Sequence, residues 1–172
     1  MKNSLPLIFA ILLCISCKKT SDAEFSGEYF IGLYIHPNEI THIVPSSDTT
    51  QLELNLDDSN TWKFVPSGLN KYSISPAANT NRVLSGNNYL LKLITKPGVL
   101  SNNEKFYIEK SSVNEFFFRS VGSGYVINVL YAEKNNTIWG YGIQLEPQDS
   151  CLFIYSNVDT NYCFTNFNLR KK

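Results

Sequence analysis

Histidine is scarce in this chain, and the residue patterns of common catalytic sites are missing. The two histidines, His36 and His42, lie six residues apart, which matches no recognisable zinc signature. Ser123 lies between glycines but lacks the GxSxG elbow of serine hydrolases. The carboxylates Asp57 and Asp58 fall in a turn, where the facing geometry of a glycosidase pair is not expected. We therefore expect no enzymatic activity, no cofactor and no metal site.

Charge of one sign is not in excess either. The sequence has 15 Lys and Arg residues and 15 Asp and Glu residues. Apart from the short basic end Arg170–Lys172, the two signs are interspersed without a block. Because a protein that binds nucleic acid carries a basic face, we expect no nucleic-acid partner.

Long hydrophobic runs are also lacking. The apolar run from Leu5 to Ile15 is about 11 residues, whereas a helix needs about 20 to cross a bilayer. The run follows the basic Lys2 and precedes Ser16 and Cys17, which is the three-part layout of a secretion signal. We therefore expect a signal and not an anchor helix.

The pair Ser16–Cys17 resembles the lipobox of bacterial lipoproteins, in which the cysteine is acylated and becomes the new N-terminus. The resemblance implies a signal peptide over residues 1–17 with lipidation of Cys17, and a polar, flexible tether over 18–25. Such a protein contacts the membrane through its N-terminal lipid. We expect it in the bacterial cell envelope, at the outer membrane. A cleaved signal without lipid is the alternative.

Only two cysteines, Cys151 and Cys163, follow Cys17. A disulfide between them could persist in an oxidising envelope compartment. In a hairpin with Ile154 opposite Tyr162, the two cysteines would share one face but be displaced by two residues, so a bulge or register shift would be needed to bring them together. A disulfide and two buried free thiols both remain open.

What the chain does have is a recurring pattern of hydrophobic pairs, in which a second pair begins ten positions after the first. The pattern starts three times, at Trp62, Phe106 and Leu152, which are 44 and 46 residues apart. A fixed period of this size indicates a repeat architecture. The pairs are Trp62–Phe64 with Tyr72–Ile74, Phe106–Ile108 with Phe116–Phe118, and Leu152–Ile154 with Tyr162–Phe164; a lone pair, Tyr29–Ile31, precedes them.

Most apolar segments are short and bounded by Gly, Pro, Asn or Ser, as expected for strands joined by turns. Their spacing allows three units of about four strands over residues 26–172, the length of one domain. The prediction is an all-β domain of the β-trefoil type, with six strands in a barrel and six that cap one end. Trp62, Phe106 and Leu152 would take equivalent places around a shared apolar centre.

The stretch around Phe106 resembles a repeat of the ricin-type β-trefoil lectins. Phe106 takes the place of the family's Trp, Glu104 that of its Gln, and Asn128 that of its sugar-binding Asp. The preceding stretch repeats the pattern, with Trp62 at the Trp place and Ser85 at the Asp place. The resemblance implies a trefoil that binds carbohydrate.

A sugar site needs an aromatic face and polar groups around it, since burying sugar hydroxyls without partners is costly. The third repeat offers such a set. We predict a glycan site formed by Asn128, Trp139, Tyr141 and Asp149.

Two other interpretations remain. A trefoil can also serve as a protein-interaction or inhibitor module that binds an envelope protein, because fold alone does not decide function. The ten-residue spacing could instead come from successive hairpins of an eight-stranded, lipocalin-like barrel that carries an apolar ligand. Gly27 and Tyr29 would then give that barrel its glycine-then-aromatic opening.

Overall fold

The computed structural model describes residues 24–172 apart from 37–38, 48–49, 57–58, 136 and 153. The predicted signal peptide, Cys17 and most of the tether lie outside these residues. The described chain has thirteen strands and one short 3-10 turn, η1 (Asn102–Glu104), so the predicted all-β class is confirmed. Within the described ranges, no helix has the length and apolar character needed to cross a membrane.

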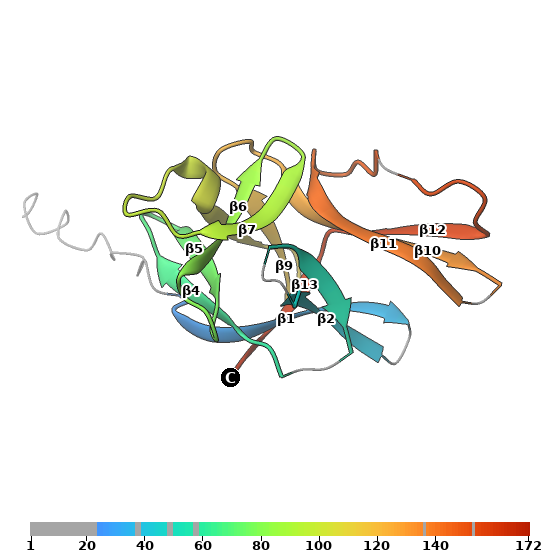
Figure 1. The fold of residues 1–172 in the computed structure, drawn as a ribbon, viewed down its shortest axis with the longest axis horizontal. Coiled ribbons are helices and arrows are strands. Elements are labelled where there is room, and N and C mark those ends of the chain that lie inside the picture. The colour runs from blue at the N-terminus through green and yellow to red at the C-terminus, as the bar shows by residue number, and fades with distance from the viewer. Residues whose placement is uncertain (1–23, 37–38, 48–49, 57–58, 136, 153) are drawn as a thin grey trace, which may run out of the picture.

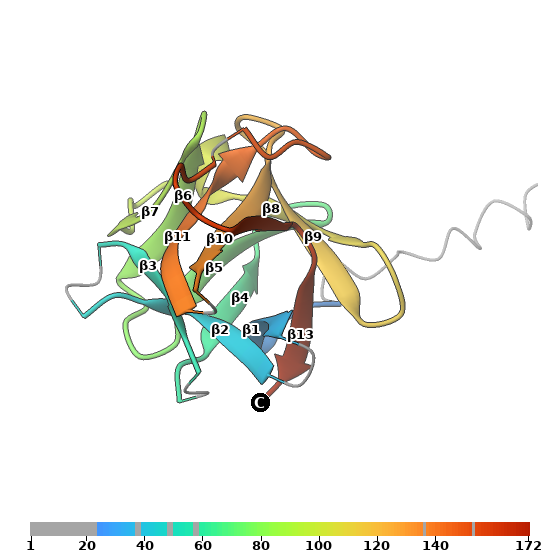
Figure 2. The same ribbon diagram turned by 90° about the vertical axis from the view of Figure 1, so that its right-hand side faces the viewer.

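Six strands close into an antiparallel barrel (Figures 1 and 2). Closure pairs both sides of each ring strand over part of its length, so the barrel itself has no open edge. In order around the ring, the strands are β1 (Gly27–His36), β4 (Trp62–Pro66), β5 (Lys71–Pro76), β8 (Phe106–Lys110), β9 (Glu115–Ser120) and β13 (Phe167–Lys171).

Three hairpins lie between the ring strands in the sequence. They are β2–β3 (Glu39–Pro45 and Leu52–Asn55), β6–β7 (Arg82–Asn87 and Leu90–Thr95) and β10–β11 (Val126–Lys134 and Thr137–Glu146). The hairpins also contact one another, because the Leu93 N–H donates to the Thr50 carbonyl at 3.1 Å and the Leu145 N–H to the Tyr89 carbonyl at 3.1 Å. An extra strand, β12 (Thr160–Phe164), pairs with β10.

Alternation along the ring strands builds the core. In β4, for example, Trp62 and Phe64 are buried while Lys63 between them is exposed, the period of two that a half-buried strand requires. The first ring strand of each of three successive stretches of the chain contributes one residue to the centre of the core, and the hairpin that follows it contributes another. A cavity of about 10 Å³ at the centre is lined by Ile31, Ile74 and Phe118 from ring strands and by Ile43, Leu84 and Ile127 from hairpins, together with Leu52 and Trp62.

Phe25 closes the barrel at the end opposite to the hairpin side chains. Its ring makes contacts with Tyr29, Tyr72 and Phe116, at centroid distances of 6.4, 5.8 and 5.2 Å. The residue is buried, so the predicted tether of 18–25 is wrong at its last residue. Phe25 belongs to the core because a large aromatic ring there removes the apolar barrel end from water.

The third predicted core pair is wrong. Leu152 and Ile154 are 62 % and 66 % exposed and lie outside any strand, although Leu152 falls at the expected spacing after Phe106. The place corresponding to Trp62 and Phe106 is taken by Phe167, which begins β13 and is fully buried. The insertion of β12 and its preceding loop lengthens the third unit and shifts its core residue along the chain.

Cys151 and Cys163 are joined by a disulfide, with 6.1 Å between their Cα atoms. They do not face each other across the predicted hairpin, because β12 pairs with β10 and Cys163 lies opposite Leu130. Residues 151–152 and 154–157, here called the strap, instead run across the β10–β11 hairpin. The Tyr155 hydroxyl donates to the Tyr141 carbonyl at 2.7 Å, and the Leu152 N–H donates to Glu146 Oε2 at 3.1 Å.

The lipocalin-like alternative is wrong. An up-and-down meander pairs each strand with the next one in the chain, whereas β1 pairs with β4 and β13, and β5 pairs with β8. A central cavity of about 10 Å³ is at the lower limit for one water molecule. The interior is therefore filled by side chains and has no room for an apolar ligand.

Candidate functional site

Asn128, the centre of the predicted sugar site, is 1 % exposed and is used within the fold. Its amide NH₂ donates to Glu146 Oε2 at 2.9 Å and to the Ser150 carbonyl at 2.7 Å, which occupies both hydrogens. Its Oδ1 has no hydrogen-bond partner among the described residues but is buried. The assignment of Asn128 to a ligand is therefore wrong, because its amide is not accessible.

The other three predicted residues are exposed but do not surround one site. Trp139 is 58 % exposed on β11, where the Lys134 ammonium lies 4.7 Å from the centre of its ring. Asp149 lies in a turn with a positive φ of 63°. Tyr141 lines an open groove of about 640 Å³ between β3, β7 and β11, which we call the cap groove. A role in ligand binding stays a prediction for these three residues.

The cap groove has both apolar and polar lining residues. Leu52, Leu91 and Ile143 line it beside Tyr141, and Leu90 at its edge is 67 % exposed. Glu53, Lys92 and Gln51 supply polar groups at its rim. Such a lining offers several exposed aliphatic side chains beside its polar groups.

A second groove, of about 850 Å³, lies beside the barrel between the β4–β5 turn and β8, and we call it the side groove. The turn is tight: the Ser67 N–H donates to the Lys71 carbonyl at 2.7 Å, and Gly68 and Asn70 both have positive φ, at 133° and 54°. Glycine and asparagine tolerate this conformation better than other residues. The turn thereby places the Asn70 amide and the Lys71 side chain at the groove.

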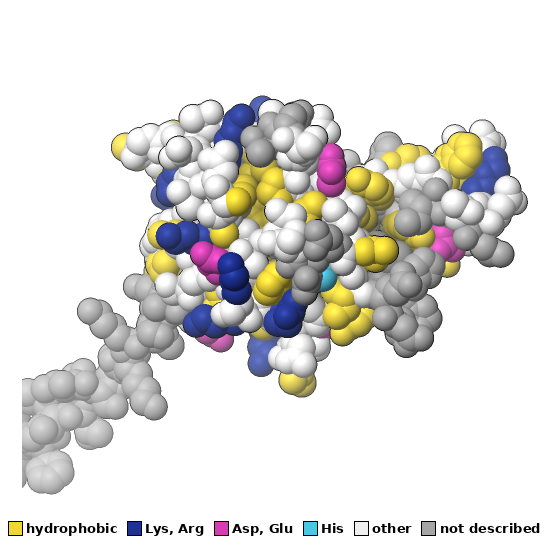
Figure 3. All heavy atoms as spheres, turned by 60° about the horizontal axis from the view of Figure 1, so that its bottom comes forward, with side chains coloured by type: hydrophobic (Ala, Val, Ile, Leu, Met, Phe, Trp, Pro, Cys, Tyr) yellow, Lys and Arg dark blue, Asp and Glu magenta, His cyan; other side chains and the backbone are white. Residues whose placement is uncertain are grey.

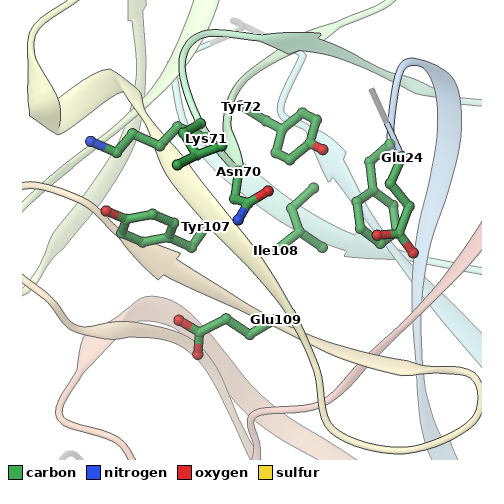
Figure 4. A pocket seen from close by; sticks show the side chains of 9 residues that line it. Glu24, Asn70, Lys71, Tyr72, Tyr107, Ile108 and Glu109 are labelled. Carbon is green, nitrogen blue, oxygen red and sulfur yellow. The ribbon is translucent and has the colours of Figure 1, made fainter. Parts of the chain in front are cut away.

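The strand β8 supplies the opposite wall. Its alternation places Phe106 in the core and leaves Tyr107 and Glu109 at the groove. Figure 4 shows the Tyr107 ring beside the Lys71 side chain, with the Asn70 amide to the right of both and Glu109 below Tyr107. The Lys71 ammonium lies 5.7 Å from the centre of the Tyr107 ring. Phe25, Tyr72, Ile108 and Leu69 add apolar surface, and Glu24 a further carboxylate.

Arg119 fixes the Glu109 carboxylate from the neighbouring strand β9. Its Nε lies 2.9 Å from Glu109 Oε1 and its Nη2 lies 2.9 Å from Oε2, a two-pronged contact. The hydrogen bonds with Glu109 raise the pKa of Arg119 above its ordinary value, and the nearby negative charge of Asp149 adds to the effect. Arg119 therefore holds the Glu109 carboxyl group in a fixed orientation at the groove.

The side groove can hold a polar ligand by its shape and its mixture of groups. Tyr107 offers an aromatic surface, Asn70 a donor and an acceptor, Lys71 a cation and Glu109 an anion. No histidine, cysteine or serine lies among its lining residues. The groove thus brings together an aromatic face and polar groups that can hold a ligand.

Glu146, Cys151 and Cys163 place one potential metal-ligand atom each within 4.8 Å of one another. Both sulfur atoms are joined in the disulfide, and Glu146 accepts hydrogen bonds from Asn128 and the Leu152 N–H. This cluster is therefore structural.

Sequence reasoning missed the side groove because its residues come from three separate segments between Glu24 and Glu109. One local signal was present: Tyr107 and Glu109 alternate with the predicted core residues Phe106 and Ile108 and must therefore face outward. A comparison with models of known protein families finds no match, and a comparison with curated proteins finds none either.

Proposed function

We propose that this chain is a lipid-anchored, non-catalytic binding protein of the bacterial envelope, with a β-trefoil fold and a carbohydrate ligand in the side groove. Cys17 would carry the lipid. The proposal joins the lipobox-like start of the sequence to the arrangement of the barrel and its groove.

The register of the ring strands supports the trefoil. Each of the three units runs from a ring strand through a hairpin to a second ring strand, and the two ring strands of a unit pair with each other. The same buried positions face one another in all three units. These pairs are Tyr29 with Trp62, Tyr72 with Phe106, and Phe116 with Phe167.

The observation that carries the carbohydrate proposal is the half-buried Tyr107 ring in an open groove with Asn70, Lys71 and Glu109 around it. A sugar presents C–H groups on its ring face and hydroxyl groups on its rim. An aromatic surface with charged and amide neighbours satisfies both parts of such a ligand. The cap groove differs in that its leucines contribute exposed aliphatic surface.

The test is a glycan array probed with the mature protein, followed by titration of any ligand found. Tyr107→Ala should weaken binding about tenfold or more, since the loss of about 1.4 kcal/mol corresponds to a factor of ten. Tyr141→Ala is the matched control, because it removes an exposed tyrosine from the cap groove and should leave affinity unchanged. Silence across plant, host and bacterial glycans, or loss only in Tyr141→Ala, would remove the side-groove proposal.

Protein binding is the second candidate, and exposed apolar residues around the cap groove and the β10–β11 hairpin favour it. Leu90, Trp139, Leu152 and Ile154 are all more than half exposed. Aromatic and aliphatic side chains of this kind commonly anchor protein interfaces. A pull-down from envelope extract should then return a stoichiometric partner that is lost with Leu90→Ser and is not displaced by free sugars.

A further inference from the structure

The basic end of the sequence forms part of the barrel wall. Arg170 lies opposite Phe30 in the β13–β1 pair, and the Lys172 N–H donates to the Glu28 carbonyl at 3.0 Å. Lys63 lies opposite Glu28 on the other side of β1. Because directly opposite residues share one face of a sheet, these side chains lie together on the outside of the barrel.

This outer surface of β4, β1 and β13, here called the basic wall, comprises Lys63, Arg170 and Lys172 with Glu28 and Phe30. The Lys172 ammonium lies 3.3 Å from Glu28 Oε2 and its side chain is 62 % exposed. The Arg170 guanidinium lies 4.1 Å from the centre of the Phe30 ring. Among the described residues of the basic wall there are thus three cations and one acid. Figure 3, which brings the lower side of Figure 1 forward, shows Lys and Arg side chains gathered on this face.

We propose that the basic wall docks onto the anionic lipid surface that holds the N-terminal anchor. This inference rests on the proposed lipidation of Cys17. From Cys17 to Phe25 the chain has eight residues, which span at most about 29 Å. Phe25 is fixed in the barrel end and β1 begins two residues later, so the wall lies within reach of the lipid.

Charge and tethering act together in this arrangement. A lysine or arginine near an anionic membrane contributes about 1 kcal/mol, which is small for a free protein. The lipid anchor keeps the wall at the surface, so the same weak attraction can orient the domain. The Phe30 ring beside Arg170 provides an aromatic group at the level of the headgroups.

Docking in this orientation leaves the β8 wall of the side groove accessible, while its Glu24–Phe25 edge adjoins the tether. In the ring order, β8 lies three strands from β1 in either direction and is therefore across the barrel from it. Tyr107 and Glu109, both on β8, would then face away from the membrane. The same orientation that holds the wall on the lipid presents the groove to an external ligand.

The test uses the lipidated full-length product, purified from membranes and reconstituted in vesicles of phosphatidylcholine alone or with phosphatidylglycerol. A membrane-impermeant amine-acylating reagent is added, and labelling of each lysine is read by mass spectrometry. Lys63 and Lys172 should be labelled at least about threefold more slowly on the anionic vesicles, and high salt should restore their labelling. Lys92, on β7 of the separate β6–β7 sheet, and Lys96, which directly follows β7, are the controls and should not change.

Each outcome has a distinct meaning. Equal labelling on both vesicle types, or the same slowing with a soluble anionic polymer and no vesicle, overturns the docking proposal. Lys63→Glu should restore labelling of Lys172 on anionic vesicles, and its failure to do so also counts against the proposal. Flotation with the vesicles reports the lipid anchor separately: a protein that does not float lacks the anchor, whatever its wall does. Glycan binding in solution reports the groove independently of both.

Discussion

Ser85 and Asn128, which the sequence comparison placed where lectins of the ricin type carry a sugar-binding aspartate, are buried in the fold. The Ser85 hydroxyl donates to Glu104 Oε1 at 3.0 Å, and the Asn128 amide donates to Glu146 Oε2 at 2.9 Å. All four side chains are buried. A buried carboxylate is tolerated only when hydrogen bonds replace its water, so each pair fixes two segments of the backbone to each other.

Glu104 offers a test of this role. Burial by itself raises the pKa of its carboxyl, but the hydrogen bonds from the Ser101 side chain and N–H and from Ser85 outweigh burial, so the pKa falls below its ordinary value of 4.5. A depressed folded-state pKa gives stability that is present above pH 4.5 and is lost as the pH falls through the folded value. We expect Glu104→Ala to lower the free energy of unfolding at pH 7 by about 1–3 kcal/mol.

Urea unfolding between pH 7 and pH 3 checks this prediction. The difference in the free energy of unfolding between wild type and Glu104→Ala should shrink as the pH falls. Protonation of Glu104 in the wild type removes the stabilisation that the ionised carboxylate gains from its hydrogen bonds. Glu115→Ala is the control, since Glu115 also accepts a hydrogen bond from a serine, Ser112, but on the surface. A change above about 0.5 kcal/mol in that control would indicate a general effect of removing a glutamate.

For single residues, the sequence predicts which ones are buried in the core better than which ones form the side groove. Trp62, Phe106 and Phe118 are recognised as buried because hydrophobic periodicity depends on neighbouring residues alone. Asn70 and Tyr107 meet only because β5 pairs with β8, and that pairing depends on closure of the whole ring. Asn128 was misassigned because its neighbour Glu146, which decides its burial, is 18 residues away.

Among the elements, β12 and the strap are held to the barrel differently from the rest. β12 pairs with one strand, β10, and the disulfide joins Cys163 to the strap at Cys151. The Asn161 amide and the Tyr155 backbone form two further hydrogen bonds, of 2.9 and 3.2 Å. Gly140 allows the close approach, because a Cβ there would lie 3.1 Å from the Tyr155 ring.

We therefore expect the double change Cys151→Ser and Cys163→Ser to loosen this region without unfolding the barrel. The chain-entropy model gives about 3 kcal/mol for a closed loop of roughly this size. Amide hydrogen exchange should rise in β12 and the strap and stay unchanged in β4, β5 and β8. Uniformly faster exchange in the ring strands would show that the disulfide supports the whole domain.

Most elements could be predicted, because alternating apolar residues between turns report strands directly. The segments around Leu52, Trp62, Tyr72 and Phe116 all lie in strands. The third unit failed because a chance match, Leu152 and Ile154, stood at the repeat spacing while an inserted strand moved the true core residue to Phe167. The spacing alone could not show this, because apolar residues of the additional segment fall at the position that the repeat predicts.

For the whole molecule, the three units share a single core, and Phe167 should be as important to it as Phe106. Phe167→Ala should lower the free energy of unfolding by about 3–5 kcal/mol, the usual cost of emptying a buried aromatic position. Leu152→Ala, at the place that the period indicated, should change it by less than about 0.5 kcal/mol. Comparable losses in both variants would contradict the assignment of Phe167 to the third unit.

Trp62 provides the measurement, since its buried indole N–H donates to the Ile43 carbonyl at 2.7 Å and joins a ring strand to a hairpin. In a Trp139→Phe background its fluorescence reports the core alone. Unfolding followed by this signal and by circular dichroism should coincide if the ring and hairpins form one cooperative unit.

Phe25 also determines how force enters the domain. Tension on the segment that precedes it would act first on a ring wedged among Tyr29, Tyr72 and Phe116, one aromatic from each of three ring strands. The force is therefore transmitted to three strands at once, and β1 is not separated from its neighbours one hydrogen bond at a time. If Cys17 carries the proposed lipid, a pull on that residue would have to remove Phe25 from this cluster of rings before the barrel strands separate.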